Sequence, residues 1–468
     1  MATKLILFLI HVAIINFIAN LVNTVVPDPY MDEIFHIPQA QRYCEGNYHE
    51  WDPKLTTPPG LYIISNLIIL PLSHLVHSVN FCSIEFLRAT NILFSIGLYV
   101  VFWKVLAYLH PYQNKKTRAF NAFVLTSFPV NWFYNFLYYT DSGSTFFILW
   151  SYLLALKREF WMSAMVSGVG VFFRQTNIGW VCFILGVSVI DVLSDNNFSS
   201  KHFIGILRPV KNKNIRFGIA IQEIFKFTLI AIRNLVELMI IFFPYILVIL
   251  SFIYFLIWNG GVVLGDKANH IAVLHFPQIF YFISFVFFFA ITVVLKFKHI
   301  KRITYSIMSR QITTTIMSLL PLMILMAFLI HNYTHEHPFL LSDNRHYTFY
   351  IWKNIYRRHY TIKYILIPCY IVAGWILWHP LASKQSFIWI MVYITATCIT
   401  LVPSPLLEFR YFIIPYYIYR LNVKQPSIER LIIEFLIYAC INYKTLYLFL
   451  WNGFIWESES DRIQRFMW

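Results

Sequence analysis

Charged residues are scarce in this sequence, because Asp, Glu, Lys and Arg together make up only 13% of its 468 residues. A soluble domain typically carries about a quarter charged residues. Hydrophobic residues account for 58% and aromatic residues for 19% of the chain, which is more apolar surface than one soluble core can hide. The composition therefore excludes an ordinary soluble protein and favours a chain that exposes apolar surface to lipid.

Cysteine is also scarce, and the six cysteines lie mostly inside apolar runs. They form no CxxC pair and no zinc-type spacing, so we expect no metal site and no disulfide framework. The sequence also lacks a glycine-rich phosphate loop, and HExxH, DxD and GxSxG motifs are missing from any suitable context. These absences speak against metal-dependent transfer from a soluble nucleotide sugar, and we expect no cofactor.

The net charge of +15 does not indicate nucleic-acid binding. The Lys and Arg residues cluster in short loops between apolar runs and never form a long basic face. We therefore expect membrane lipid, and no nucleic acid, among the partners. The largest basic connector, 194–218, is expected on the cytosolic surface, where basic loops are retained.

Apolar stretches near 20 residues in length predict about a dozen transmembrane helices in a single membrane-embedded domain, 1–468. The first stretch is longer than the core of a signal peptide and reads as a retained span. The run 61–80 is interrupted by Pro71, Ser73 and His74, so we expect it to be re-entrant or interfacial. The predicted spans are 5–26, 84–109, 119–139, 144–157, 160–173, 178–193, 230–258, 276–295, 308–330, 361–379, 387–402 and 428–450.

The basic clusters also predict which loops share one side of the membrane. Cationic loops stay cytosolic, and four basic clusters, 115–118 and 157–158 among them, fall on one side if the spans alternate from 84 onward. The opposite side then receives nearly every unusual polar cluster of the chain. Its predicted loops are 27–60, 138–143, 173–177, 259–275, 331–352 and 403–410.

The first of these loops, 27–60, is the least membrane-like part of the chain, with six of its 22 acidic residues. Asp32 and Glu33 precede His36 by one helical turn, so two carboxylates and an imidazole are expected to converge. A carboxylate beside apolar walls can have a raised pKa and act as a general base toward a sugar hydroxyl. The alternative is purely structural, because acidic residues also stabilise a helix N-terminus.

Further ionisable side chains stand at the ends of predicted spans on the same side. Such groups are costly at a membrane boundary unless they are paired or functional. A phosphate diester that emerges from the bilayer needs cationic donors, and Arg suits phosphate best. Each group taken singly also has a structural alternative, as a snorkelling residue. The candidate substrate-binding residues are His36, Trp51, Asp52, Asp141, Arg174, Lys267, His270, Asn344, Arg345, His346 and Arg410.

Seven motifs in these loops occur in order across most of the chain. Together they resemble the endoplasmic-reticulum alpha-1,2-glucosyltransferases that use dolichyl phosphate glucose. The motifs are YMDEIFHIPQAQRYC (30–44), EWDPKLTTPPGLY (50–62), LYYTD (137–141), FRQTN (173–177), GDKANH (265–270), HPFLLSDNRHYTFYIW (337–352) and PLLEFRYFIIP (405–415).

The resemblance implies an all-α polytopic membrane protein of the C-type glycosyltransferase fold, with about 12 or more transmembrane helices and a catalytic first luminal loop. It implies inverting transfer of the third and last glucose from dolichyl phosphate glucose to the diglucosylated dolichyl-diphosphate oligosaccharide. The site would face the lumen of the endoplasmic reticulum. The acidic motif of the family falls on Asp32, which we interpret as the base, and Glu33, which would support it.

Two other hypotheses remain. One is a polytopic transporter whose intramembrane ions line a path, although the polar groups here gather at one face. The other is a related lipid-phosphate-sugar glycosyltransferase that acts earlier in the same pathway. The last segment, WESESDRIQRFMW (456–468), contributes nothing to the resemblance, and we assign it no role.

Overall fold

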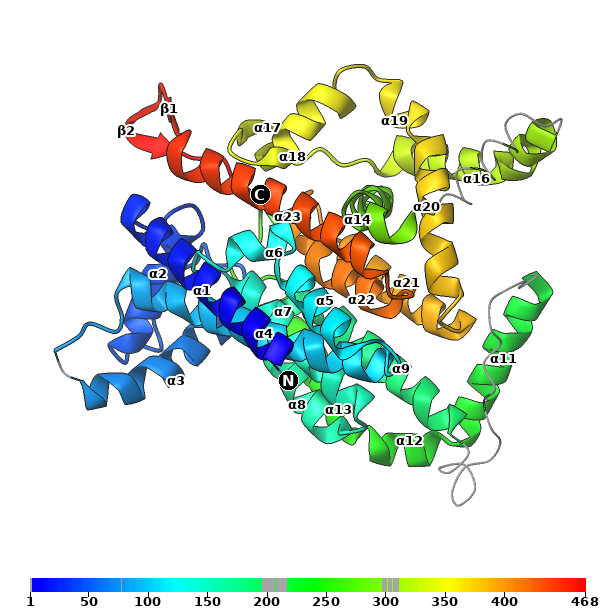
Figure 1. The fold of residues 1–468 in the computed structure, drawn as a ribbon, viewed down its shortest axis with the longest axis horizontal. Coiled ribbons are helices and arrows are strands. Elements are labelled where there is room, and N and C mark those ends of the chain that lie inside the picture. The colour runs from blue at the N-terminus through cyan, green and yellow to red at the C-terminus, as the bar shows by residue number, and fades with distance from the viewer. Residues whose placement is uncertain are drawn as a thin grey trace.

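The computed structural model describes residues 2–76, 78–195, 207, 217–296, 301, 305 and 311–468. Most of the predicted basic connector, 194–218, lies outside the described residues. Within them the chain is a bundle of helices (Figure 1). In chain order the elements that carry the argument are α1 (Ala2–Val25), α2 (Glu33–Cys44), α3 (Gly60–Leu75), α4 (Ile84–Leu109), α5 (Lys115–Thr126), α6 (Pro129–Tyr134), α7 (Thr140–Leu156), α8 (Phe160–Phe173), α9 (Ile178–Ser194), α11 (Phe217–Arg233), α12 (Leu235–Ile241), α13 (Phe243–Asn259), α14 (Gln278–Val294), α16 (Gln311–Tyr333), α17 (Pro338–Ser342), α18 (Tyr347–Ile351), α19 (Ile362–Ile365), α20 (Ile367–Ala382), α21 (Phe387–Leu401), α22 (Ile413–Asn422), α23 (Ile428–Trp451), β1 (Phe454–Trp456) and β2 (Glu459–Gln464).

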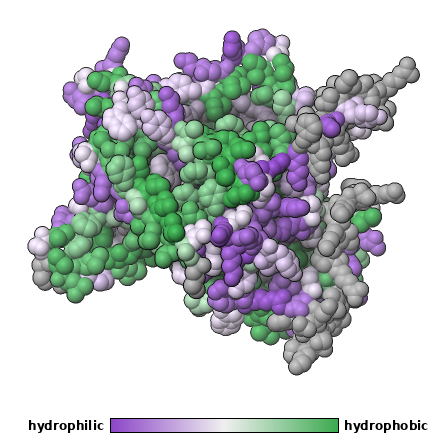
Figure 2. Space-filling view, in the orientation of Figure 1, coloured by the Kyte–Doolittle hydropathy of each residue, from purple (hydrophilic) through white to green (hydrophobic). Residues whose placement is uncertain are grey.

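The apolar runs form helices, as predicted. Helices α4 and α8 begin and end at the predicted residues. A mostly apolar segment in a bilayer must satisfy its own backbone hydrogen bonds, and a helix does so. Large hydrophobic side chains are exposed along α1, α13 and α23, among them Phe17, Tyr254 and Tyr443. Figure 2 shows hydrophobic residues across the middle of one face, with hydrophilic residues along its upper edge and in its lower centre. This distribution confirms a helical membrane protein.

The number of long spans differs from the prediction. In the described part of the chain, five helices are long and apolar enough to cross a bilayer, or six if the bent pair α12–α13 is one span. Two predicted spans are broken: 119–139 becomes α5 and α6, and 230–258, after the last residues of α11, becomes α12 and α13, which meet at 82°. Each break precedes a proline, Pro129 or Pro244, in the first turn of the next helix. Proline cannot donate to the preceding turn, so it starts a new helix there.

Several regular elements were not predicted, helix α11 among them. Helix α22 carries Arg420, which forms a fully buried ion pair with Glu434 of α23 at 2.7 Å. The chain also ends in an antiparallel hairpin, β1–β2, which departs from the all-α prediction. In Figure 1 this hairpin continues from the end of α23 and lies at the upper left, on the opposite side of the bundle from α11 and α12.

The predicted absence of disulfides is wrong. Cys44 at the end of α2 is bonded to Cys82, which precedes α4, and their Cα atoms are 6.5 Å apart. The spacing of the two residues along the chain gave no sign of this pair, because α3 lies between them and the fold brings them together. At its other end, α3 begins at Gly60, which packs against the backbone of Phe172. The chain therefore leaves loop 27–60 at Gly60 and returns to it at Cys82, just after the interrupted run 61–80.

The opposite end of the bundle gathers several of the basic loops. Arg158, in the turn between α7 and α8, pairs with Asp191 at 2.8 Å and also with Asp195. Lys384, between α20 and α21, donates to His110 after α4 at 2.6 Å. The predicted cytosolic clusters at 115–118 and 157–158 thus lie away from the loops that form the cavity described next.

Candidate active site

A cavity of about 1720 Å³ lies where the polar loops meet at one end of the bundle. All six loops that the basic clusters place opposite the cytosol contribute to its wall, although they come from distant parts of the sequence. The final segment of the chain forms a seventh part of the wall. Most of the lining comes from within 25–36, 54–57, 139–145, 174–178, 262–272, 339–348, 403–414 and 456–467, and Tyr134, Trp180, Phe252, Ile399 and Thr400 complete it.

The motifs fit directly against one another around this cavity. The amide N–H of Asp266 donates to the carbonyl oxygen of Pro53 at 2.9 Å. Gly265 is required at this contact, because a Cβ atom there would lie 2.2 Å from the same carbonyl oxygen. Gln175 donates from its side chain to the carbonyl oxygen of Thr56 at 2.5 Å. Backbone contacts of this kind hold the loops in one arrangement.

Asp32 faces the cavity, with 38% of its side chain accessible. The preceding residue, Met31, has a left-handed backbone with φ 56°, a conformation that costs a non-glycine residue about 1–2 kcal/mol. The amide N–H of Asp32 donates to the hydroxyl of Tyr139 at 3.0 Å, and its carboxylate accepts from Arg410 at 2.8 Å. The loop is thus fixed on both sides of the carboxylate.

The ionisation of Asp32 differs from the expectation of a raised pKa. Burial does raise the pKa of this carboxyl, but the charge of Arg410, with a smaller effect of His36, outweighs it and holds the pKa below its usual value. Burial lowers the pKa of His36 to about 4, so its imidazole is neutral at physiological pH. Its Nδ1 atom lies 2.6 Å from the hydroxyl of Tyr62. Asp32 is therefore ionised near neutral pH.

Glu33 points away from the cavity and is fully buried. Arg88 of α4 donates to both carboxylate oxygens, at 2.9 and 2.6 Å. The amide groups of Tyr30 and Tyr138 each donate to one of the same oxygens, at 3.0 and 2.6 Å. Glu33 therefore joins the first loop to α4 and to the motif LYYTD.

Two further ion pairs complete what we call the arginine cluster: Asp32, Asp141, Arg174, Glu408 and Arg410. Arg410 binds Glu408 through two hydrogen bonds, one of them 3.0 Å long, as well as Asp32. Arg174 binds Asp141 at 2.5 Å. Both guanidinium groups remain partly accessible, with 17% and 14% of their side chains exposed. The cluster therefore presents two cations and a carboxylate to the cavity.

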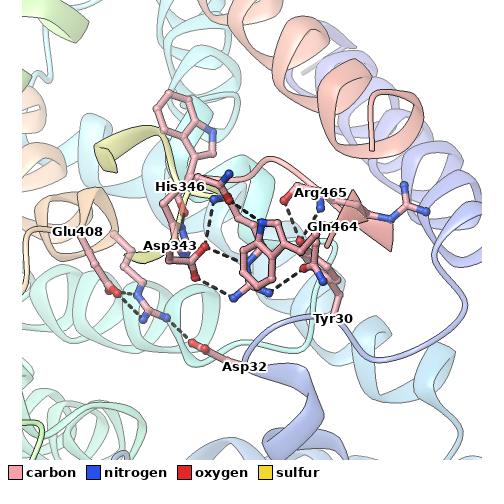
Figure 3. Close-up of polar contacts among 12 residues, drawn as sticks. Tyr30, Asp32, Asp343, His346, Glu408, Gln464 and Arg465 are labelled. Carbon is pink, nitrogen blue, oxygen red and sulfur yellow. Dashed lines mark hydrogen bonds and ion pairs between the residues drawn. The ribbon is translucent and has the colours of Figure 1, made fainter. Parts of the chain in front are cut away.

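A second polar group lies on the cavity wall near the end of the chain (Figure 3). Asp343 accepts two hydrogen bonds from Arg345, at 2.9 and 2.8 Å, and Arg345 also donates to Gln464 at 3.0 Å. His346 lies 2.8 Å from the carbonyl oxygen of Trp468. The motif HPFLLSDNRHYTFYIW and the final segment thus form one surface.

Comparison with known proteins now decides the family. The model of the DIE2/ALG10 family matches residues 26–421. The chain belongs to this family. It is 41% identical over 453 residues to a Rattus norvegicus protein named Dol-P-Glc:Glc(2)Man(9)GlcNAc(2)-PP-Dol alpha-1,2-glucosyltransferase, covering 94% of this chain and 93% of that protein. Proteins of the same name from Homo sapiens and Arabidopsis thaliana are 41% and 34% identical, each covering at least 93% of both chains.

These findings confirm the resemblance seen in the motifs. No solved structure matches the chain.

The structure brings most of the predicted site residues to the cavity but leaves some outside it. Those outside are held in other contacts: Trp51 packs against Tyr62, Asp52 caps its own turn, and Lys267 donates to a backbone carbonyl. Asn344 accepts from the indole of Trp456. The predicted residues that line the cavity are Asp32, His36, Asp141, Arg174, His270, Arg345, His346 and Arg410.

Sequence reasoning missed several residues of the site. Arg88 could have been found from the sequence, because an arginine inside an apolar run is costly unless it is paired or functional. Glu408 lies in the predicted loop 403–410 but was not among the candidate site residues. The final segment offered no signal, because its contacts with Tyr30 and Arg345 depend on how the bundle closes. Among the described residues, no group of three or more His, Cys, Asp or Glu could hold a metal ion.

Proposed function

We propose that this chain transfers glucose from dolichyl phosphate glucose to the diglucosylated dolichyl-diphosphate oligosaccharide, forming the terminal alpha-1,2-linked glucose used in protein N-glycosylation. The observation that carries this proposal is the pairing of Asp32 with Arg410 inside the cavity. A sugar phosphate needs a cation at its phosphate and a base near its anomeric carbon. The names of relatives 41% identical to this chain point to the same reaction.

The arginine cluster supports a specific order of events. The donor phosphate carries a negative charge that competes with Asp32 for Arg410, and Arg–phosphate contacts are strong and geometrically defined. Arg174 lies in the same cluster and can share this charge. Once the phosphate binds Arg410, the Asp32 carboxylate loses a partner, and its basicity rises because the nearby positive charge is shared.

The chemical step then needs one base. The acceptor hydroxyl oxygen attacks the anomeric carbon of glucose while Asp32 takes the hydroxyl proton. The bond between the anomeric carbon and the phosphate oxygen breaks, its electron pair stays on the phosphate, and dolichyl phosphate leaves. A single displacement of this kind inverts the anomeric centre. The exposure of Asp32 supports it as the base, because the carboxylates of Asp141 and Glu408 are only 1% and 16% exposed.

Glu33 is proposed as a positioning residue. It touches the backbone on both sides of the site, through the amide groups of Tyr30 and Tyr138. Its carboxylate is surrounded by donors of the protein and is completely buried, so no substrate hydroxyl can reach it. Glu33 therefore fixes the loop that carries Asp32 instead of exchanging protons with the sugar.

The orientation of the site toward the lumen of the endoplasmic reticulum is part of the proposal. The Cys44–Cys82 disulfide adjoins the first loop, and disulfides persist in oxidising compartments and are rare in the cytosol. The basic loops lie at the other end of the bundle, as expected for the cytosolic side. Both observations support a lumen-facing cavity.

The C-type fold and a count of about twelve crossings also belong to the proposal. Besides the five or six long spans, the described chain contains shorter apolar helices of 10–17 residues, among them α8, α14 and α21. Helices below the usual span length can cross where the bilayer thins or where neighbouring helices cover them. Of these shorter helices, we exclude α3 from the crossings because the chain that follows it returns to the first loop, where Cys82 is bonded to Cys44.

A direct assay tests the reaction and separates it from the alternatives. The purified chain is reconstituted in proteoliposomes with radiolabelled dolichyl phosphate glucose and with lipid-linked oligosaccharides that carry one or two glucoses. We expect label only in the product of the diglucosylated acceptor, with one dolichyl phosphate released per glucose. Transfer to the monoglucosylated acceptor would identify the earlier enzyme of the pathway, and movement of substrate without transfer would favour a transporter.

A further inference from the structure

The final segment of the chain forms part of the cavity wall. Its hairpin β1–β2 is fixed to the site by side-chain contacts: Trp456 donates its indole N–H to Asn344 at 2.9 Å, and Gln464 accepts from Arg345 at 3.0 Å. The hydroxyl of Tyr30 donates to the carbonyl oxygen of Arg465 at 2.8 Å and accepts from its amide N–H at 2.7 Å. Each contact joins the segment to a motif that also lines the cavity.

The same hairpin contributes polar and aromatic residues to the cavity wall. Trp456, Glu459, Asp461 and Arg462 all belong to the lining, and the last three are exposed residues. The guanidinium group of Arg345 lies 4.6 Å from the centre of the Trp456 ring, a cation–π distance that holds the indole in place. A fixed aromatic ring beside carboxylate and guanidinium groups is the chemistry that binds sugars, because the ring packs on sugar C–H groups while the charges bind hydroxyls.

Both substrates carry a dolichyl tail, but the donor reacts close to its tail, whereas the acceptor reacts at the far end of a long oligosaccharide. A polyprenyl tail needs an apolar path from the bilayer, and Ile178, Trp180, Phe252 and Ile399 from the apolar helices α9, α13 and α21 supply apolar lining on one part of the wall. The oligosaccharide is hydrophilic and arrives from water. The hairpin is the part of the wall with the most exposed charged side chains from a single element, so it suits the oligosaccharide.

We propose that Trp456, Asp461 and Arg462 bind the glucose-bearing end of the acceptor oligosaccharide, with Trp456 as the packing platform and Asp461 and Arg462 as hydroxyl ligands. This inference rests on the proposed function and adds a specificity element to it. Because Arg345 links the hairpin to the motif HPFLLSDNRHYTFYIW, a bound acceptor also steadies the wall that adjoins the arginine cluster. The hairpin thereby helps to select the acceptor on which the last glucose is placed.

The test compares variants on the cavity side of the hairpin with a matched variant in its turn. Asp461→Asn removes a charge in the cavity wall, whereas Glu457→Gln removes one from an exposed residue that does not line the cavity. Steady-state kinetics in proteoliposomes give separate Michaelis constants for acceptor and donor. We expect Asp461→Asn and Trp456→Ala to raise the acceptor constant roughly ten-fold, the loss expected for one charged or packing contact. The donor constant should stay within about two-fold in both variants, and Glu457→Gln should change neither constant.

The outcomes separate binding from a structural role. Trp456→Phe keeps a ring at the platform but lacks the indole N–H, so it should retain most of the acceptor affinity if the ring packs on sugar. Equal increases in both Michaelis constants, or an unchanged acceptor constant in Asp461→Asn and Trp456→Ala, would overturn the proposal.

A second measurement keeps this inference separate from the proposed reaction. Saturation-transfer NMR with the free diglucosylated oligosaccharide reports contact with the protein without any glucose transfer. We expect glucose proton signals with the wild-type chain and with Glu457→Gln, and their loss with Trp456→Ala. If the wild type transferred no glucose yet showed these signals, the reaction assignment would fail while the sugar-binding hairpin would stand. Signals that persisted in Trp456→Ala would remove the hairpin assignment instead.

Discussion

Replacing Glu33 by Gln is expected to destabilise the fold more than it alters the chemistry. Each carboxylate oxygen accepts two hydrogen bonds: one oxygen from Arg88 and the amide of Tyr138, the other from Arg88 and the amide of Tyr30. An amide at position 33 must point its NH2 group at one of these pairs of donors, whichever way it is turned. It also leaves Arg88, which is 2% exposed, without its counter-charge.

The expected cost follows from this geometry. Breaking a buried ion pair by removing one partner typically costs about 3–5 kcal/mol, and backbone carbonyls of Val26 and Asp28 that already accept from Arg88 compensate for part of it. For a chain of this size such a loss lowers the midpoint of thermal unfolding by roughly 5 °C or more. The measurement is the unfolding midpoint of the purified protein in detergent, followed by tryptophan fluorescence.

A control variant and a double variant test whether the loss of stability comes from the Glu33–Arg88 pair. Glu45→Gln removes an exposed carboxylate from the same loop and should change stability by no more than about 0.5 kcal/mol. The double variant Glu33→Gln, Arg88→Met should be less destabilised than the sum of its single variants, by at least about 1 kcal/mol, because the two side chains are in contact. A Glu33→Gln protein that unfolds like the wild type but transfers no glucose would refute the positioning role and make Glu33 a reacting group.

Three other predictions address the pKa, the sidedness and the loop packing. A lowered pKa keeps Asp32 ionised at neutral pH, so activity should fall only as the pH drops through that lowered value. Arg410→Gln removes the positive charge that lowers this pKa and leaves the effect of burial, which raises it, so the acid limb of the pH–rate profile should shift to higher pH. An unshifted limb would show that Asp32 is not the group that titrates there. Tyr112 and Asn47 are both exposed and lie at opposite ends of the bundle. In sealed microsomes and a background without free cysteines, a membrane-impermeant maleimide should label Tyr112→Cys and leave Asn47→Cys unlabelled until detergent is added. The reverse pattern would invert the proposed orientation. Gly265→Ala places a methyl group against a backbone carbonyl of the first loop, so it should lower the unfolding midpoint, while Gly261→Ala, with open space around it, should not.

The set of loops that lines the cavity was predictable from sequence, because the positions of Lys and Arg residues indicate which loops lie on the same side of a membrane. Basic loops mark one side of a membrane protein, so the remaining loops, with Asp32, Arg345 and Arg410 among them, could be assigned to a common side before any contact was known. The structure brings these six loops to one cavity, together with the final segment. Helix boundaries in uninterrupted apolar runs, such as 84–109, were predictable for a similar reason, since the bilayer requires backbone hydrogen bonds to be satisfied within each segment.

The pairing of side chains was not predictable, because it depends on how distant elements pack. Asp32 and Glu33 are adjacent in sequence and have the same charge, yet one faces the cavity and the other is buried against Arg88. The expected rise in the pKa of Asp32 considered only apolar walls and missed Arg410, 378 positions away. The Cys44–Cys82 disulfide and the contacts of Arg345 with Gln464 were hidden for the same reason.

The most direct test of the account is glucose transfer by Asp32→Asn. Its control is Glu45→Gln, and both proteins are compared with the wild type after their folded fractions have been matched by thermal unfolding. The account predicts that Asp32→Asn binds dolichyl phosphate glucose and unfolds near the wild-type midpoint but transfers glucose at least about 100-fold more slowly, the loss typical of a missing general base. Transfer by Asp32→Asn at the wild-type rate would contradict the account.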